Sequence, residues 1–133
     1  MLVKILIVGL GSIGTRHLTN ILTETNNEVI IYTKRSNTNT LNKKNVKIFH
    51  DLKSCIFEKP DIAFITNETT YHIPIAKKLA KLGLDLFIEN VGSEFGFSKD
   101  RLHTIRNQFI KTKTKLKTRI LCCRSHFNCV RNI

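Results

Sequence analysis

The sequence predicts an α/β fold in which a doubly wound parallel sheet forms a single domain. Two observations lead to this prediction. Short apolar runs alternate with helical patterns along most of the 133 residues. Parallel strands joined by right-handed crossovers produce this alternation, with helices covering both faces of the sheet. In addition, a turn with three glycines joins the first apolar run to the first helical pattern, as is typical of a βαβ unit.

Six strands are expected. Each is a short run rich in Ile, Leu, Val or Phe, the composition of a strand buried on both faces of a parallel sheet. The runs are Lys4–Val8, Val29–Tyr32, Val46–Phe49, Ile62–Thr66, Leu84–Ile88 and Ile120–Cys123. The Asn- and Thr-rich stretch Ser36–Asn45 indicates a loop between the second and third strands.

Four helices are expected between these strands. They are Ser12–Glu24, a helix from an Asp51 N-cap to near Pro60, a helix from a Thr70 N-cap through Leu82, and a helix from a Ser98 N-cap to about Lys111. Asp, Thr and Ser are good N-caps because their side chains accept hydrogen bonds from free N–H groups. Pro74 is compatible with a first helical turn, and Gly83 with a helix end.

Composition narrows the functional classes. The 22 Lys and Arg against 10 Asp and Glu give a net charge of +12, and the run Lys111–Arg119 alternates basic with other residues. This run could contact phosphates or an acidic surface, or could be a solvated linker. It contains no aromatic residues on which bases could stack, so nucleic acid is not the expected partner.

No apolar run reaches the roughly 20 residues of a membrane helix. The four cysteines fit no zinc pattern, so we expect a cytoplasmic protein without a metal site.

The glycine-rich turn Gly9–Gly14 has the pattern GxGxxG between a buried strand and a helix. In this context Gly9 permits a tight turn, Gly11 lets the backbone approach a pyrophosphate, and Gly14 lets helix and strand pack closely. The free N–H groups at the helix start, at Ser12 and Ile13, would hold the phosphate charge. The pattern therefore favours dinucleotide binding; the alternative is a glycine-rich turn without a ligand.

The end of the second strand indicates which dinucleotide would bind. NAD sites usually place a carboxylate there for the adenosine ribose, but here the strand continues as Thr33, Lys34 and Arg35, with no carboxylate between Glu28 and Asp51. Ammonium and guanidinium groups suit a 2′-phosphate. The expected cofactor is NADP or NAD, with NADP preferred, unless these are ordinary loop charges.

Three segments together, Val8–His17, Asp61–Asn67 running on to His72, and Phe87–Glu89, resemble the Gfo/Idh/MocA family of NAD(P)-dependent sugar oxidoreductases. The resemblance implies an NAD(P)-binding Rossmann domain over residues 1–125, with residues 126–133 as a tail or the start of a second domain. The cofactor-binding set that follows from motif and resemblance is Gly9, Gly11, Ser12, Ile13, Gly14, Thr33, Lys34, Arg35, Asn67, His72 and Glu89.

The sequence departs from the family in ways that affect catalysis. Members usually carry Glu-Lys-Pro after the fifth strand, where this chain has Glu89-Asn90-Val91, and an amide cannot move a proton as the lysine does. Glu68 also stands where relatives often have proline. Members continue with a domain that supplies most of the sugar pocket. We therefore assign no catalytic residue and expect a sugar substrate only with a partner domain; the alternative is a non-catalytic sensor or scaffold. The surface where that domain would pack favours self-association as a homo-oligomer.

Three further side chains have alternative interpretations. His72 matches a family histidine on the cofactor side of the sheet, or it is a helix-end histidine with a structural hydrogen bond. His17 is expected to pack or cap on the first helix. Cys55 is expected in the core.

Overall fold

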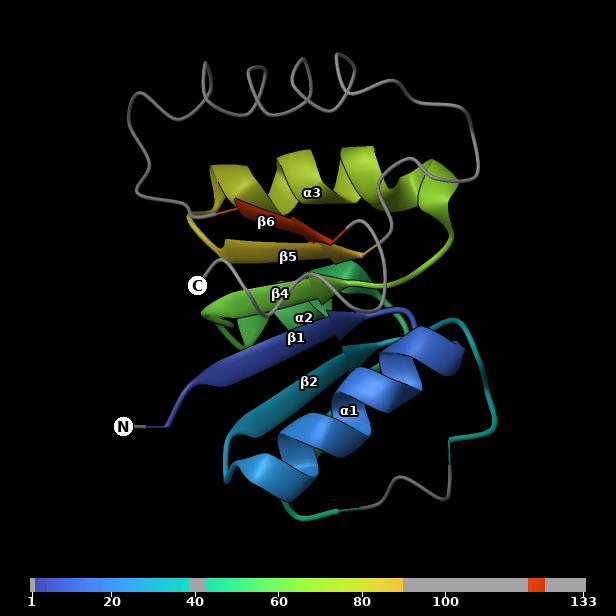
Figure 1. Cartoon of the computed structure of the whole chain (residues 1–133), viewed down its shortest axis with the longest axis vertical. Helices are drawn as coiled ribbons and strands as arrows, with labels where there is room; N and C mark the ends of the chain where they lie inside the picture. The colour runs from blue at the N-terminus through green and yellow to red at the C-terminus, as the bar shows by residue number, and fades with distance from the viewer. Residues whose placement is uncertain (1, 39–42, 90–119, 124–133) are drawn as a thin grey trace.

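A computed structural model describes residues 2–38, 43–89 and 120–123. Its sheet has six strands in the order β3-β2-β1-β4-β5-β6, and every neighbouring pair is parallel (Figure 1). The strands are β1 (Lys4–Val8), β2 (Glu28–Tyr32), β3 (Val46–Phe49), β4 (Ile62–Ile65), β5 (Asp85–Glu89) and β6 (Ile120–Cys123). The predicted α/β fold with a doubly wound parallel sheet is confirmed, and this strand order is that of the dinucleotide-binding Rossmann fold.

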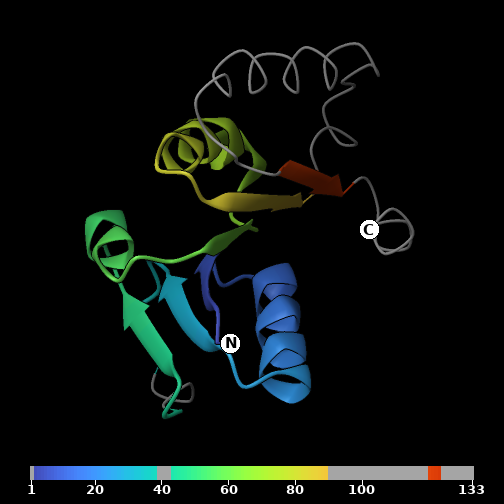
Figure 2. The same ribbon diagram turned by 90° about the vertical axis from the view of Figure 1, so that its left-hand side faces the viewer.

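Helices cover both faces of the sheet. They are α1 (Ser12–Glu24), α2 (Leu52–Phe57) and α3 (His72–Lys81), with a 3-10 turn, η2 (Thr69–Tyr71), directly before α3. In Figure 2 the blue α1 lies on one side of the sheet and the green α2 on the other. Strands β2 and β3 are added on one side of β1, and β4 to β6 on the other. Because every crossover is right-handed, these two directions place the connecting helices on opposite faces of the sheet.

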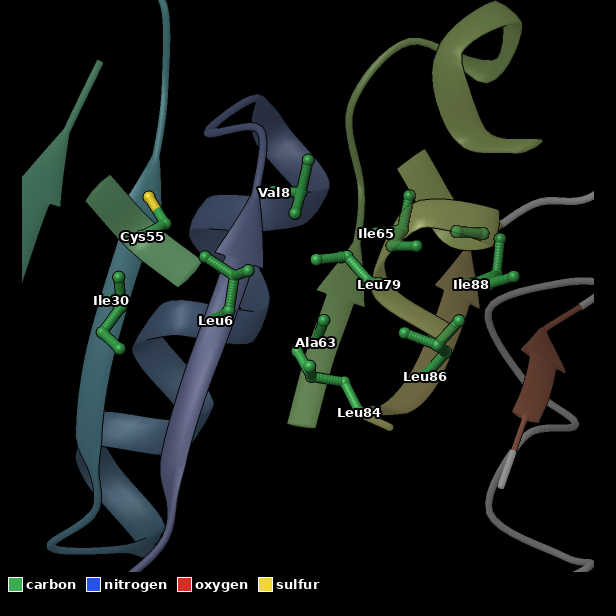
Figure 3. Close-up of a cluster of buried hydrophobic side chains, with 11 residues drawn as sticks. Leu6, Val8, Ile30, Cys55, Ala63, Ile65, Leu79, Leu84, Leu86 and Ile88 are labelled. Carbon is green, nitrogen blue, oxygen red and sulfur yellow. The ribbon is translucent and has the colours of Figure 1, made fainter. Parts of the chain in front are cut away.

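Alternating strand residues build two cores. Leu6 and Ile30 point to the face covered by α2 and α3, where they join Leu79 and other fully buried side chains (Figure 3). Ile7 points to the opposite face and packs with Leu18 of α1. Because side chains alternate between faces along a strand, the continuous apolar run of β1 supplies both cores.

The predicted N-cap at Thr70 is wrong. Residues Thr69–Tyr71 form the 3-10 turn, and α3 begins at His72 with Tyr71 at the N-cap position, where its side chain makes no capping bond. The tighter turn is closed by the Tyr71 N–H, which donates to the Glu68 carbonyl at 2.9 Å. Backbone groups thus provide what a threonine hydroxyl would have provided.

The predicted end of α3 at Gly83 is confirmed, one residue after the C-cap Leu82. Gly83 has φ +84°, its N–H donates to the Ala80 carbonyl at 3.0 Å, and the Leu84 N–H donates to Leu79 at 3.3 Å. This pair of bonds is a Schellman motif, which needs a left-handed residue that glycine adopts without strain. Helix α2 also has its predicted Asp51 cap, which accepts from the Ser54 N–H at 2.7 Å, but it ends at Phe57, before Pro60.

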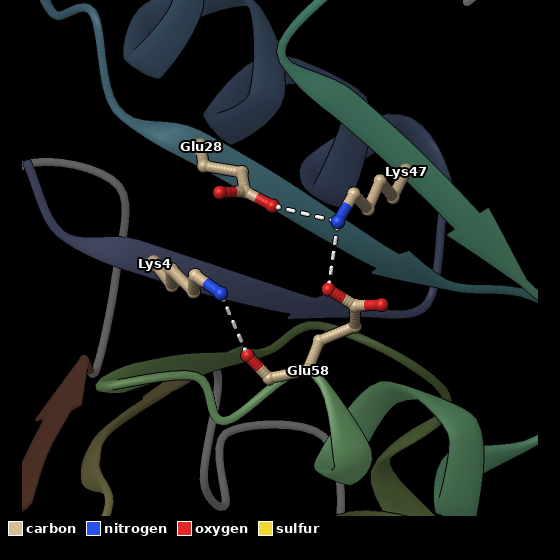
Figure 4. A network of polar contacts seen from close by, with 4 residues as sticks. All are labelled: Lys4, Glu28, Lys47 and Glu58. Atoms are coloured by element: carbon tan, nitrogen blue, oxygen red, sulfur yellow. Dashed lines mark hydrogen bonds and ion pairs between the residues drawn. The ribbon is translucent and has the colours of Figure 1, made fainter.

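A polar network joins the strands at the amino edge of the sheet (Figure 4). Lys47 Nζ lies 3.3 Å from Glu28 Oε1 and 2.8 Å from Glu58 Oε2, and Lys4 Nζ donates to the Glu58 carbonyl at 3.0 Å. The hydrogen bond from Lys47 lowers the pKa of Glu58, and the bonds to Glu58 and Glu28 raise the pKa of Lys47. These charges are therefore compensated within the fold.

Several sequence predictions concern residues outside the described ranges. They include the helix from Ser98 to Lys111, the basic run Lys111–Arg119, the motif position Asn90 and the tail 126–133. Within the described ranges, no helix combines the length and the apolar character needed to cross a membrane.

Candidate functional site

A pocket of about 490 Å³ opens at the carboxyl edge of the sheet, where β1 and β4 lie side by side and the strand order reverses. Ligands of open α/β sheets bind at this switch point, and the volume is in the range of small-molecule and cofactor sites. The lining residues come from the glycine loop, the end of β2, and the segment after β4: Gly9, Leu10, Gly11, Ser12, Ile13, Tyr32, Thr33, Lys34, Arg35, Thr66, Asn67, Glu68, Tyr71 and Ile75. Eight of the eleven predicted site residues are among them, whereas Gly14 and His72 are not, and the side chain of Glu89 is not described.

Gly9 brings the glycine loop against the segment that follows β4. Its φ is +91°, and a Cβ on Gly9 would lie 2.6 Å from the Cα of Asn67. Its N–H donates to the Tyr32 carbonyl at 2.9 Å. Any other residue would be strained here and would also separate the loops.

Gly14 makes the close approach between α1 and the loop before it. A Cβ here would lie 2.1 Å from the Gly9 carbonyl oxygen and 2.8 Å from Thr66 Oγ1. The Thr66 hydroxyl is itself within hydrogen-bonding distance of two carbonyls, at 2.9 Å from Gly9 O and 3.1 Å from Val8 O. Gly14 is buried behind the pocket wall, so its effect on the pocket is through packing.

Gly11 is the N-cap of α1 and differs from the other two. A Cβ at this position would meet no atom within 4 Å, and its φ of −82° suits any residue. The first turn of α1 has no acidic residue and no side-chain cap, so the N–H groups and the positive end of the helix dipole are not compensated there. The space beside Gly11 and these donors fit a phosphate group.

The segment after β2 is held by hydrogen bonds from its backbone, and its two cations are exposed. The Thr33 N–H donates to the Phe49 carbonyl at 3.1 Å, and the His50 Nδ1 donates to the Thr33 carbonyl at 2.8 Å. The Arg35 N–H donates to Thr33 Oγ1 at 3.2 Å. Lys34 and Arg35 are exposed and line the pocket, and within the described chain no carboxylate pairs with either.

Asn67 and His72 lie one behind the other at the end of β4. The Oδ1 of Asn67 is buried and has no hydrogen-bond partner among the described residues, although Asn67 lines the pocket. His72 is 3% exposed, and its Nε2 donates to the Asn67 carbonyl. The geometry therefore supports the structural interpretation of His72, as a group that holds the loop carrying Asn67. Glu89 ends β5, and its side chain lies outside the described atoms.

Sequence reasoning did not single out Tyr71, Glu68 or Ile75 as lining residues. Tyr71 is 49% exposed, and the Lys34 Nζ lies 5.5 Å from its ring centroid. The spacing of Tyr71 and Ile75 could have indicated them, because residues four apart share one side of a helix, and this helix begins just after β4. In the sequence, Glu68 is distinguished only as a departure from the family pattern.

His17 and Cys55 do not line the pocket. The His17 ring packs against Phe64 and Phe87, with centroids 5.2 and 5.4 Å away, so the predicted packing role is confirmed. Cys55 is fully buried, also as predicted, and burial raises the pKa of its thiol to about 12. A thiol with this pKa is not a nucleophile at neutral pH. The described residues contain no His, Cys, Asp and Glu cluster that could hold a metal ion.

Comparison with known proteins agrees with this geometry. A family model described as the oxidoreductase family, NAD-binding Rossmann fold, matches residues 3–90. No curated protein sequence matches the chain.

Solved structures share the fold. Scyllo-inositol dehydrogenase from Lactobacillus casei, with bound NAD(H) and scyllo-inositol, is 24% identical with a TM-score of 0.69, over 90% of this chain and 36% of its own. A probable dehydrogenase from Thermotoga maritima is 20% identical with a TM-score of 0.69, over 90% and 35%. Biliverdin reductase from Synechocystis, in complex with biliverdin and NADP+, is 14% identical with a TM-score of 0.67, over 90% and 38%. The chain thus spans little more than a third of the length of these proteins.

Proposed function

The chain belongs to the Gfo/Idh/MocA oxidoreductase family, whose NAD-binding Rossmann domain it matches over residues 3–90, and from this premise we propose that its pocket binds NADP(H) in preference to NAD(H). The observation that carries the preference is the pair Lys34 and Arg35, which line the pocket and pair with no described carboxylate. A 2′-phosphate would supply the missing anion, through charge-assisted hydrogen bonds to the guanidinium and ammonium groups.

The remaining contacts follow from the lining of the pocket. The N–H groups of Ser12 and Ile13, beside the open space at Gly11, would bind the pyrophosphate. Asn67 would offer its unpartnered Oδ1 to a hydroxyl or amide donor of the cofactor. Gly9 and Gly14 would hold the loop in shape through close backbone packing, and neither has a side chain that could bind the ligand. Glu89 ends the neighbouring strand at the same edge of the sheet.

The wider activity that we propose is a hydride transfer on a sugar or polyol, carried out together with a second domain. When bound, the dinucleotide would supply the hydride donor or acceptor. This chain's residues would bind and orient the dinucleotide. The position of the family lysine is occupied by Asn90, whose amide cannot carry a proton. Asn90 also favours the second candidate, a module that binds the dinucleotide without turnover.

The cofactor proposal is tested by fluorescence titration with NADPH and NADH. We expect tighter binding of NADPH, and we expect Arg35→Ala to weaken NADPH binding by about 1–3 kcal/mol while leaving NADH nearly unchanged. Arg16→Ala is the matched control, because Arg16 is exposed on α1 and does not line the pocket. Equal affinities of the unaltered chain for both nucleotides would refute the preference.

A second measurement separates the two candidate activities. The purified chain is incubated with NADP+ and a panel of polyols, and NADPH formation is followed by fluorescence. We expect binding without turnover, because a positioned proton-transfer group is typically worth about 10²–10⁴ in rate and substrate positioning contributes further. Robust oxidation of any polyol by this chain alone would refute that expectation.

A further inference from the structure

Two pocket residues from different loops contact each other at the rim. Lys34 follows β2 and Tyr71 ends the 3-10 turn before α3, yet the Lys34 Nζ lies 5.5 Å from the centroid of the Tyr71 ring. This distance is within the range of a cation–π interaction. Both residues line the pocket, and the ring is 49% exposed, so one edge of the pair remains open to a ligand.

The backbone on both sides of Lys34 is fixed, which leaves the side chain as the variable part. Thr33 bonds through its N–H to Phe49 and through its carbonyl to His50, at 3.1 and 2.8 Å. Arg35 bonds back to Thr33 Oγ1 at 3.2 Å. A lysine side chain has four flexible carbons and considerable rotamer entropy. Contact with the Tyr71 ring therefore restricts the one part that the backbone bonds leave free.

The group that contacts Lys34 determines how strongly the ammonium can attract an anionic ligand. A carboxylate close to Lys34 would neutralise its field and would repel an anion, as two carboxylates do around Lys47 at the other edge. The ring of Tyr71 is uncharged and attracts the ammonium only through its quadrupole. It can orient the ammonium without cancelling its charge.

We propose that Tyr71 is a positioning residue that holds Lys34 ready for the 2′-phosphate of the dinucleotide, so that Tyr71 contributes to NADP selectivity without contacting the phosphate. This inference rests on the proposed function and adds a residue to it. The ring lowers the entropy that Lys34 loses on binding, which is the usual benefit of preorganisation.

The test is a double-mutant cycle with NADPH and NADH as probes. Tyr71→Leu removes the ring and keeps apolar bulk, Lys34→Met removes the ammonium, and the third variant carries both changes. We expect Tyr71→Leu to weaken NADPH binding about two- to fivefold and to leave NADH unchanged. In the Lys34→Met background, Tyr71→Leu should have no further effect on NADPH. Tyr71→Phe should bind NADPH as the unaltered chain does, since the ring alone positions the ammonium.

The cycle also identifies the competing role of the ring, which is to stack on the adenine. In that case Tyr71→Leu would weaken both nucleotides equally and would do so in the Lys34→Met background as well, which would overturn the inference. An unchanged NADPH affinity in Tyr71→Leu would overturn it too. Failure of the unaltered chain to bind either nucleotide would refute the proposed function, and this inference with it. Thermal unfolding of each variant is the control for stability, and we expect unchanged unfolding temperatures because Tyr71 is 49% exposed and Lys34 is exposed.

Discussion

At the amino edge of the sheet Lys47 contacts the carboxylates of Glu28 and Glu58, whereas at the carboxyl edge Lys34 lies over the uncharged ring of Tyr71 and pairs with no described carboxylate. The same side-chain type therefore has opposite uses at the two ends of the strands. At one edge the fold compensates the lysine charge with two carboxylates, and at the other no described carboxylate does so.

The glycines at the two edges also have different roles. Gly83, before β5, has φ +84° and closes α3, and an added Cβ there would meet no atom within 4 Å. The glycines of the loop after β1 make close backbone approaches at Gly9 and Gly14 and leave open space at Gly11. The glycine at the amino edge thus ends a helix, whereas the glycines at the carboxyl edge shape a pocket. Substitutions at each edge should separate stability from binding accordingly.

The largest effect on stability is expected from Gly14→Ala. Its Cβ would lie 2.1 Å from the Gly9 carbonyl oxygen, which belongs to backbone and cannot turn aside, so α1 must shift away from the loop. We expect the free energy of unfolding to fall by about 2–3 kcal/mol, measured by urea denaturation. Gly11→Ala is the control, and it should lose no more than about 1 kcal/mol, the cost of alanine at an N-cap position where no atom obstructs the added Cβ. A tolerated Gly14→Ala would show that the two backbones are not in contact.

A smaller loss is expected from Gly83→Ala at the amino edge. No atom obstructs the added Cβ, so the cost is only the left-handed backbone, at about 1 kcal/mol. Because Gly83 is remote from the pocket, the affinity for NADPH should not change. Equal urea midpoints for the variant and the unaltered chain would contradict the Schellman assignment, and weakened NADPH binding would contradict the separation of the two edges.

The smallest effect is expected from Glu58→Gln, and it depends on pH. The hydrogen bond from Lys47 lowers the pKa of Glu58 below its usual 4.5, so its contribution is complete above that pH and is lost as the pH falls through the lower folded value. The variant should therefore unfold at a lower temperature than the unaltered chain at neutral pH, and the difference should close on acidification.

Asp51 has a lowered pKa for a different reason, its hydrogen bonds from Ser54. Asp51 is present in the Glu58→Gln variant and in the unaltered chain, so its contribution cancels when their unfolding temperatures are compared. Glu24→Gln, at the exposed end of α1 and outside the network, is the matched control. A difference in unfolding temperature between Glu58→Gln and the unaltered chain that stays constant from neutral to acid pH would contradict the ion-pair account.

The predictable features are those that a short stretch of sequence determines. The apolar runs specify strands buried on both faces, and the spacing of Gly9, Gly11 and Gly14 specifies a turn between strand and helix. Lys34 and Arg35 could be placed at the pocket because parallel strands end at one edge of the sheet. The first two inferences use residues that are neighbours in the chain, and the third adds only this general rule for parallel strands.

The features that the sequence did not reveal depend on contacts between distant segments. Tyr71 contacts Lys34 from the 3-10 turn that replaces the first turn expected from a Thr70 cap. Thr66 tethers the glycine loop through bonds to Val8 and Gly9, which precede it by more than fifty residues. Local propensity cannot report such pairs, since tertiary packing decides between a hydroxyl cap and a backbone-closed turn.

The central claim, that the pocket at the carboxyl edge binds a dinucleotide through the start of α1, is tested most directly by Gly11→Val. The position has ordinary extended backbone and no atom within 4 Å of an added Cβ, so the chain should stay folded and lose only the roughly 1 kcal/mol that a poorer N-cap residue costs, while the new side chain occupies the space for the pyrophosphate. We expect the dissociation constant for NADPH, measured by fluorescence titration, to rise at least about tenfold. A Gly11→Val chain that binds NADPH as tightly as the unaltered chain would contradict the site.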